Sequence, residues 1–388
     1  MFFFAFVIST FAQAPLEPIQ KVEVGKNRQF MVNGKPFFPI MSWAQPSKNY
    51  PMLRSIGINT CTGNADPVAA KAAGCYAVVG FRPSGVTENG YILGWIYSDE
   101  PDLAQGKGAE AKPRQMPDRV QARGAEIKAA NPDRLIFITL TSSFMKEQSS
   151  YNEEFRKTMY PEYVKPADVI GYDHYPIYGW GTPAHLDWVG RGVKQLVELA
   201  GPRPVYAWIE SSKGSKWMPL AKQPDVLPVH TRNEVWQSII NGATAIGYFT
   251  HAWQPDTLTF APTPDMQKEL ARLNGQITRL APAILADPAK VKIEMNMENG
   301  MNCQFKANEL DGWIYIFAQN IDLGPGAEKS KQYDPIFPRK GLATFTIEGL
   351  KAGTKIEVID ENRSLKTGKG KFTDEFGPLA EHIYKFKK

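Results

Sequence analysis

Cysteine and histidine are scarce in this chain, which limits the chemistry that it can support. Among 388 residues there are only five histidines and three cysteines, which are Cys61, Cys75 and Cys303. Neither residue type shows the short spacings of zinc ligands, so we expect no metal and no other cofactor. Cys61 and Cys75 fall on neighbouring predicted strands and could pair as a disulfide, although we favour three buried thiols.

The signature patterns of several other protein classes are also missing. The formal net charge is only +5, and there is no RRM, zinc-finger or basic-helix pattern, so we expect no nucleic-acid partner. No G-x-S-x-G motif occurs, which argues against a serine nucleophile. No glycine-rich phosphate turn occurs early in the chain, which argues against a doubly wound sheet. No stretch after the first residues approaches the ~20 apolar residues of a membrane helix, so we expect no membrane span.

The first residues, MFFFAFVISTFAQA, form an apolar run that ends in small residues at Ala12 and Ala14. This spacing is typical of a signal peptide at residues 1–14 that is cleaved after Ala14. No lysine or arginine precedes the run, which departs from the usual pattern and leaves open a truncated or wrongly assigned start. We expect a secreted or periplasmic protein.

From residue 36 onward, short apolar runs alternate with helical patterns. The apolar runs predict eight strands, at residues 36–43, 58–63, 75–81, 91–97, 134–140, 167–173, 204–210 and 245–253. Helical patterns occupy residues 52–56, 67–74, 117–131, 186–200, 235–240 and 266–280. Eight strands with helical crossovers over ~250 residues predict an α/β protein with a (β/α)8 barrel, here at residues 20–285. The segment 82–90 is too short for an ordinary crossover helix, so this crossover is abbreviated or the strand count is wrong by one.

Residues 289–388 have a different pattern. Segments such as KVKIEMNM, GWIYIFAQN, LATFTI and EHIYKF are short and β-like, and clusters of glycine, asparagine, aspartate and proline separate them. They predict an antiparallel β-sandwich domain. No low-complexity linker precedes this domain, so we expect it to pack closely on the barrel and to support it rather than to bind polysaccharide.

The C-terminal ends of the strands are where a (β/α)8 barrel places its active site. The residues that follow the eight apolar runs are Trp43, Asn64, Arg82, Asp99, Glu100, Thr141, Asp173, His174, Tyr175, Glu210, His251 and Trp253. Glu100 follows the fourth strand and Glu210 ends the seventh, so we expect the two carboxyl groups to face each other among aromatic side chains. Glycoside hydrolysis needs such a pair, with one carboxylic acid that protonates the leaving oxygen and one carboxylate that attacks the anomeric carbon.

Four motifs in the chain carry a resemblance to a known group of enzymes. GWIYSDEP, DVIGYDHYP, VYAWIES and GYFTHAW occur in this order, and together they resemble the retaining (β/α)8 glycoside hydrolases of the large clan whose acid/base follows strand four and whose nucleophile ends strand seven. NGKPFFPIMSW and FGPLAEHIYKF are similar to segments of the same group. The resemblance implies that Glu100 is the acid/base and Glu210 the nucleophile, and that Tyr175 or His174 contacts the nucleophile. It also implies that Trp253 forms the floor under the sugar.

Asp99 is where the chain departs from this clan, which commonly has asparagine before the acid/base. An ionised aspartate can only accept hydrogen bonds, so the way in which the sugar 2-hydroxyl is recognised stays open. The other expected substrate-binding residues are Trp43, Arg82 and His251, with Trp217 and Tyr178 as candidates for outer sugar subsites. The main alternative is a carbohydrate-binding protein that keeps the aromatic cleft without turnover. Amide or ester hydrolysis and transglycosylation are further alternatives.

Overall fold

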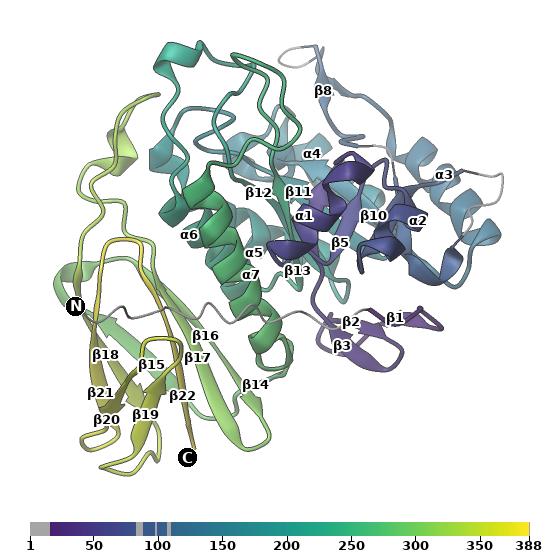
Figure 1. The fold of residues 1–388 in the computed structure, drawn as a ribbon. Coiled ribbons are helices and arrows are strands. Elements are labelled where there is room, and N and C mark those ends of the chain that lie inside the picture. Colours follow the sequence, from purple (N-terminus) through teal and green to yellow (C-terminus); the bar gives the residue numbers. More distant parts are fainter. Residues whose placement is uncertain (1–15, 83–87, 98, 107–109, 388) are drawn as a thin grey trace, which may run out of the picture.

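Eight parallel strands close into a barrel in the computed structural model, which describes residues 16–82, 88–97, 99–106 and 110–387 (Figure 1). Around the barrel the strands are β4 (Ile40–Trp43), β5 (Thr60–Thr62), β6 (Tyr76–Gly80), β7 (Ile92–Ile96), β10 (Leu135–Thr141), β11 (Val169–Asp173), β12 (Val205–Glu210) and β13 (Ala245–Phe249). β13 pairs with β4, where Gly247 lies opposite Met41, so the sheet has no free edge. The predicted (β/α)8 barrel is confirmed. The predicted signal peptide lies outside the described residues and stays a prediction.

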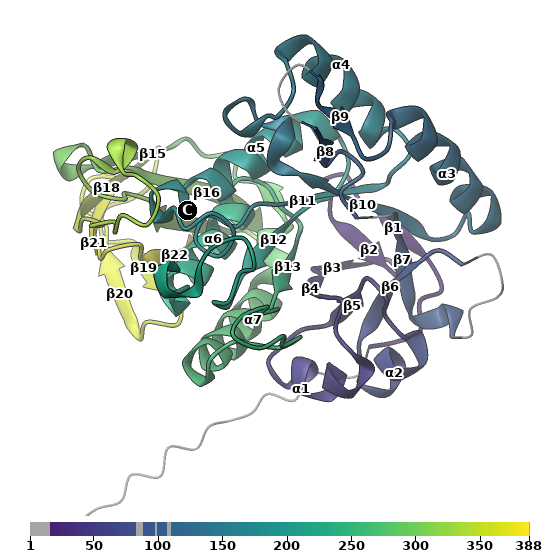
Figure 2. The same ribbon diagram turned by 90° about the horizontal axis from the view of Figure 1, so that it is seen from above.

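The helices surround the barrel, as the view from above shows (Figure 2). They are α1 (Tyr50–Ser55), α2 (Pro67–Ala72), α3 (Pro117–Ala130), α4 (Glu153–Val164), α5 (Trp188–Ala200), α6 (Pro228–Ile240) and α7 (Pro264–Ile284). Between β6 and β7 the described residues form only the 3-10 turn η2 (Asn89–Tyr91). The eight-strand closure shows that the strand count from the sequence was right and that this crossover is the abbreviated one.

Helix α4 was missed by the sequence patterns because Pro161 lies inside it, and an interior proline is normally read as a helix break. The helix forms nevertheless because its N-terminus is capped and one of its faces is buried. The side chain of Asn152 accepts the N–H of Phe155 at 2.8 Å. Tyr160 and Tyr163 are both buried, so burial of aromatic surface outweighs the local penalty of the proline.

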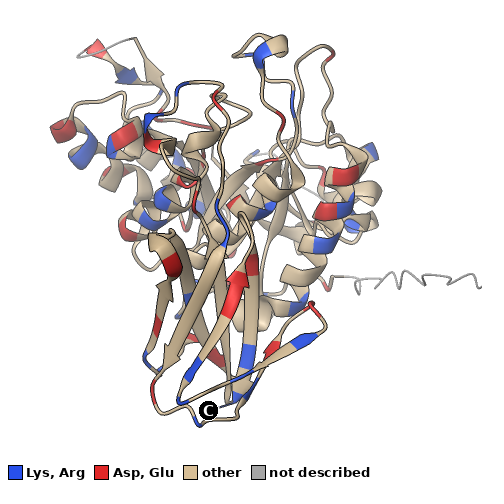
Figure 3. Ribbon diagram, turned by 90° about the vertical axis from the view of Figure 1, so that its left-hand side faces the viewer, with Lys and Arg blue, Asp and Glu red and all other residues tan. Residues whose placement is uncertain are grey.

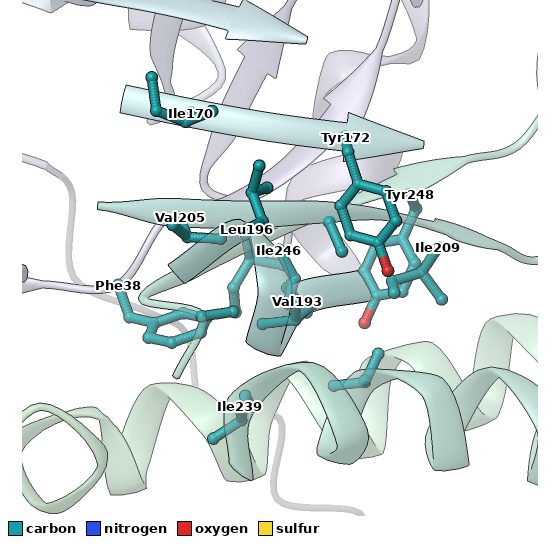
Figure 4. Packing of buried hydrophobic residues seen from close by; sticks show 14 of the residues in the cluster. Phe38, Ile170, Tyr172, Val193, Leu196, Val205, Ile209, Ile239, Ile246 and Tyr248 are labelled. Atoms are coloured by element: carbon teal, nitrogen blue, oxygen red, sulfur yellow. The ribbon is translucent and has the colours of Figure 1, made fainter. Parts of the chain in front are cut away.

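The barrel wall is packed on both faces. On the outside, residues of α5 and α6 meet residues of the strands (Figure 4); this cluster includes Val193, Leu196, Ile239, Ile170, Val205, Ile209 and Ile246. On the inside, alternate strand residues such as Phe137, Tyr206 and Trp208 fill the barrel. Each fully buried apolar side chain contributes roughly 1.5–3 kcal/mol to folding, which makes the barrel a rigid support for its loops.

A small antiparallel sheet closes the N-terminal end of the barrel. It consists of β1 (Val22–Val24), β2 (Phe30–Val32) and β3 (Lys35–Phe37). Phe30 is fully buried and stacks on Phe137 of the barrel interior, with ring centroids 5.9 Å apart. The single strand predicted at residues 36–43 is therefore two strands, β3 and β4. The closed lower end leaves the opposite end as the mouth of the barrel.

The C-terminal region is an antiparallel β-sandwich, as predicted. One sheet has the order β14 (Asp287–Pro288), β16 (Cys303–Leu310), β17 (Trp313–Asn320), β22 (Glu381–Lys387), β19 (Lys355–Val358) and β20 (Arg363–Lys366). The other has the order β15 (Ile293–Met297), β18 (Gly341–Ile347) and β21 (Lys371–Phe376). Phe345, Phe372 and Tyr384 are buried between the two sheets.

The sandwich packs directly against α6 and α7 (Figure 1). Trp236 of α6 stacks on Phe317 of β17, with ring centroids 5.8 Å apart. The side-chain amide of Asn233 donates to the backbone carbonyls of Asn320 at 3.1 Å and Leu379 at 3.2 Å. These buried hydrogen bonds tie the barrel to the sandwich, so the two parts support each other.

Charged residues of both signs are interspersed over the helices and strands (Figure 3). No helix within the described residues is long and apolar enough to cross a membrane. All three cysteines are free thiols, and Cys61 and Cys75 are buried. The thiol of Cys61 donates a hydrogen bond to the sulfur of Cys75, which in turn donates to the carbonyl of Ile58, 3.6 Å away. The interpretation as buried thiols is therefore confirmed for Cys61 and Cys75, whereas Cys303 is only partly buried.

Candidate active site

A cavity of about 640 Å³ opens at the C-terminal ends of β4 to β7, where a barrel enzyme holds its substrate. Trp43 at the end of β4 and Asn64 after β5 lie on one side, and Asp99 after β7 lies on the other. Arg123 of α3 also lines the cavity. The cavity is within the size range of small-ligand sites, about 300–1,000 Å³.

Glu100 lies beside this cavity on the loop that follows β7. Its φ angle is +44°, in the left-handed region that residues with a side chain rarely adopt. The backbone holds it there, because its N–H donates to the carbonyl of Thr139 on β10 at 3.2 Å. The Glu100 side chain is 21% exposed, with Arg114 Nη2 3.7 Å from its Oε2. Its carboxyl group also shares a hydrogen bond with that of Asp173. Strain of this kind is concentrated at functional sites.

Asp102 anchors the loop that carries Glu100. Its carboxylate is fully buried and accepts the N–H of Thr141 at 2.9 Å, the hydroxyl of Thr141 at 2.6 Å and the hydroxyl of Tyr160 at 2.8 Å. The hydroxyl of Tyr151 donates to the Asp102 carbonyl at 2.6 Å. Burial raises the pKa of Asp102 to about 6, although its hydrogen bonds oppose the rise. No role for Asp102 was predicted from the sequence; the density of carboxylates in SDEPD was the available signal.

Two further carboxyl groups surround Glu100. Asp99 is exposed to solvent at the cavity that it lines, and partial desolvation by the surrounding protein, followed by the charge of Glu100, raises its pKa to about 7. Burial, followed by the charges of Glu100 and Asp99, raises the pKa of Asp173 well above its usual range. This shift favours the protonated form of Asp173, which can donate a hydrogen bond to Glu100.

Glu210, at the end of β12, is held differently. Its carboxylate is fully buried and accepts the N–H groups of Ile177 at 3.1 Å and Tyr178 at 2.6 Å. The fully buried carboxyl group of Glu234 on α6 also hydrogen-bonds to it. Burial raises the pKa of Glu210 to about 7, whereas these hydrogen bonds lower it. Burial and the charge of Glu210 raise the pKa of Glu234 well above its usual range, so the shared proton resides on Glu234.

Successive side chains at the end of β11 and just after it point alternately into the barrel and away from it. Asp173 and Tyr175 have the inward orientation of Val169, and Tyr175 packs on Phe249 with ring centroids 5.1 Å apart. His174, in contrast, is buried behind the strand beside Trp188 of α5, with ring centroids 6.2 Å apart. Burial lowers the pKa of His174 to about 3, so this side chain is neutral. This placement does not favour contact between His174 and a substrate in the mouth, and such contact stays a prediction.

An aromatic wall forms the other half of the mouth, above β11 to β13. Tyr178 packs against Phe249 at 5.4 Å between ring centroids, and His251 stacks on Trp253 at 6.0 Å. The ring of His251 hydrogen-bonds to the backbone of Ala44 after β4, while burial lowers its pKa. Trp253 is half-buried and keeps part of its surface toward the solvent.

Arg82, which follows β6, is exposed. The neighbouring residue Phe81 lines the cavity, whereas Arg82 is not among the described residues that do so. Trp43 lines the cavity and packs edge-to-face on Trp208, 5.3 Å between ring centroids. Among the described residues, no group of three or more histidine, cysteine, aspartate or glutamate side chains has the arrangement of a metal site. Asp99 and Glu100 are thus accessible at the mouth, beside the aromatic wall. Glu210, in contrast, is fully buried beneath the loop after β11.

Comparisons with known proteins place the chain only by its fold. No protein-family model and no curated protein matches it. The structure of an AmyP variant in complex with maltotriose is 8% identical, with a TM-score of 0.50, over 88% of this chain and 90% of that chain. A GH30 endoxylanase from Clostridium papyrosolvens C71 is 12% identical, with a TM-score of 0.47, over 96% and 98% of the two chains. A family 39 glycoside hydrolase from Bacteroides cellulosilyticus WH2 is 11% identical, with a TM-score of 0.46, over 94% and 82%.

Proposed function

We propose that this chain is a retaining glycoside hydrolase that cleaves an O-glycosidic bond in an oligo- or polysaccharide. The observation that carries the proposal is the arrangement of the barrel mouth. Glu100 follows the fourth strand of a closed barrel and Glu210 ends the seventh, with a cavity on one side of the mouth and an aromatic wall on the other. Aromatic rings suit the apolar faces of sugars, and the polar groups between them suit the hydroxyls.

In this mechanism Glu100 protonates the departing glycosidic oxygen while Glu210 attacks the anomeric carbon. A glycosyl-enzyme ester forms as the glycosidic bond breaks, and Glu100 then takes a proton from the water that releases the sugar. The N–H groups of Ile177 and Tyr178 favour the ionised form of Glu210, which the attack needs. Because the Glu210 carboxylate is fully buried, the attack requires it to turn from these amides toward the sugar.

Asp99 takes the place of the asparagine that the resembled clan commonly has before the acid/base. With its pKa raised to about 7, its carboxyl group is protonated below neutral pH and then donates a hydrogen bond, as an amide does. We propose that protonated Asp99 donates to a sugar hydroxyl in the cavity that it lines.

The complete burial of Glu210 favours a second candidate function, which is carbohydrate binding without turnover. In that case the pair of Glu210 and Glu234 would serve only to hold the loop after β11. The aromatic wall and the cavity would then form the binding surface.

Labelling with a panel of 2-fluoro glycosides, followed by peptide mapping, separates the two functions. We expect a covalent label on Glu210 and none in the Glu210→Gln variant. Asp173→Asn is the matched control, because it changes a carboxyl group of the same mouth and should still be labelled. A label on Asp173 or elsewhere would refute the assignment of Glu210. Oligosaccharide binding without any label or turnover would support the second candidate.

A further inference from the structure

Two tryptophans on the rim of the barrel mouth are unusually exposed. Trp180, on the loop after β11, is 54% exposed, and Trp217, on the loop after β12, is 56% exposed. Most large aromatic side chains of the described residues are buried in one of the cores. We refer to Trp180 and Trp217 together as the rim platform.

The two loops of the rim platform meet each other and a segment of the sandwich. A Cβ atom at Gly181 would lie 2.6 Å from Met218 Sδ and 2.7 Å from the ring of Tyr333, so only glycine allows this approach. The N–H of Tyr333 donates to the Gly181 carbonyl at 2.6 Å, and the amide of Gln332 donates to the Trp180 carbonyl at 2.9 Å. Figure 1 shows the segment between β17 and β18 rising toward the loops of the barrel.

Buried contacts hold this junction in place. Ile177 and Leu186 of the barrel form an apolar cluster with Leu323 and Leu379 of the sandwich. On the neighbouring loop, the side chain of Gln223 accepts the N–H of Gly214 and that of Ser215, each at 3.0 Å, and donates to the carbonyl of Met218 at 2.8 Å. The exposed rings therefore stand on a preorganised support, which reduces the entropy that binding would cost.

Trp217 of the rim platform continues the aromatic wall of the mouth. Tyr178 of the wall packs edge-to-face on Trp217, with ring centroids 6.0 Å apart. The ammonium group of Lys216 lies 5.6 Å from the ring centroid of Trp217 and 4.8 Å from that of Trp253. A ligand that leaves the mouth past Trp253 thus meets a hydrogen-bond donor and then a flat aromatic face.

We propose that the rim platform binds the sugar units of an oligo- or polysaccharide that extend beyond the mouth, and that the sandwich segment 321–340 forms part of this site by docking at Gly181. This inference rests on the proposed function, because it assumes that the mouth binds carbohydrate. Flat aromatic surface and a donor on a flexible stem such as Lys216 match the alternating apolar faces and hydroxyl groups of a sugar chain. In this role the sandwich takes part in substrate binding as well as supporting the barrel.

Affinity electrophoresis tests the proposal with soluble xylan, glucomannan, mixed-linkage β-glucan and starch as probes. All variants carry Glu100→Gln, so that binding is measured without turnover. We expect at least one probe to retard the parent protein, and Trp180→Ala and Trp217→Ala each to raise its dissociation constant about tenfold, equivalent to about 1.4 kcal/mol. Trp217→Phe, which keeps an aromatic face, should recover part of the affinity.

Trp313→Ala is the matched control. Trp313 is half-buried at the start of β17 in the sandwich, where it pairs with Lys387 of β22. Like Trp217, it has a lysine over its ring, with Lys385 Nζ 4.6 Å from the ring centroid. It should leave retardation unchanged. Absence of retardation by every probe, unchanged affinity in both rim variants, or equal loss in Trp313→Ala would overturn the proposal. If the unsubstituted protein bound a probe through the rim but hydrolysed none, the proposed hydrolysis would fail while this proposal stood.

Discussion

Asp102 offers a direct test of how the fold holds Glu100, the proposed acid/base, in place. The carboxylate of Asp102 is fully buried, two residues beyond Glu100, and receives hydrogen bonds from the N–H of Thr141 and from the hydroxyls of Thr141 and Tyr160. The Asp102→Ala substitution removes the acceptor for all of these donors at once. Because Glu100 keeps a strained φ of +44° only while its surroundings enforce it, we expect the substitution to affect both stability and activity.

The size of the stability effect follows from the donors that lose their partner. A buried donor without an acceptor costs about 1–3 kcal/mol. The hydroxyl of Thr141 can rotate to another acceptor, whereas its N–H and the Tyr160 hydroxyl are fixed by the structure. We therefore expect Asp102→Ala to lower the free energy of unfolding by about 4 kcal/mol. Asp102→Asn keeps one oxygen for the two hydroxyls and should cost about 1–2 kcal/mol.

Urea unfolding followed by tryptophan fluorescence measures this effect, and kcat/KM on a cleaved glycoside measures the displacement of Glu100. If Glu100 is the acid/base, as proposed, its misplacement by about 1 Å should reduce the rate about 100-fold, so kcat should fall more than KM changes. Tyr160→Phe is the matched control, because it removes one donor but leaves Asp102 bonded to Thr141. It should cost about 1 kcal/mol and leave kcat close to that of the unsubstituted protein.

An Asp102→Ala protein whose stability lies within about 0.5 kcal/mol of the unsubstituted protein would refute this reasoning, because surface substitutions already produce changes of that size. A loss of stability with unchanged kcat would show that Asp102 supports the fold without positioning Glu100.

Three other predictions concern strain, ionisation and the domain interface. Glu100→Gly should be more stable to urea than Glu100→Ala by about 1 kcal/mol, because glycine adopts a positive φ freely; equal stabilities would contradict strain at this position. Asp99 and Glu210 both have pKa values raised to about 7. The value of kcat/KM should therefore fall below pH 7, as the proposed nucleophile Glu210 becomes protonated, and above pH 7, as Asp99 loses the proton that it donates to the sugar. The Asp99→Asn variant keeps a donor at every pH, so it should move only the alkaline limb to higher pH. A profile that is flat from pH 5 to pH 7 would speak against Glu210. Asn233→Ala leaves two buried carbonyls without a donor and should lower the free energy of unfolding by about 2–3 kcal/mol, measured by urea unfolding; a loss below about 0.5 kcal/mol would show that these bonds do not join the domains.

Much of the barrel could be predicted from the sequence because parallel strands buried on both faces need nearly continuous apolar residues. ILGWI in β7 and VYAWI in β12 meet that need, and all their residues are buried. Helix α4 was missed because its evidence in the sequence is local and weak, whereas its stability comes from tertiary burial of Tyr160 and Tyr163. The split between β3 and β4 was missed because it depends on the closure of the barrel end by Phe30.

Period-two alternation could have separated some of the candidate site residues in advance. In VIGYDHY, Val169 and Gly171 predict that Asp173 and Tyr175 point inward and that His174 points outward, as the structure shows. No periodicity predicts that the backbone of Ile177 and Tyr178 covers Glu210, because the path of a loop depends on what it packs against. Here the loop packs against Leu323 and Leu379 of the sandwich.

Apolar continuity and chain order are local properties, so they predict most of the barrel strands and the carboxyl groups that stand at the ends of those strands. The burial and the neighbours of each carboxyl group, in contrast, depend on how the whole chain packs. Barrel closure brings Asp173 against Glu100, and the packing of α6 brings Glu234 against Glu210. The pKa of a carboxyl group depends on its burial and on its charged and hydrogen-bonding neighbours, and those neighbours come from distant parts of the chain.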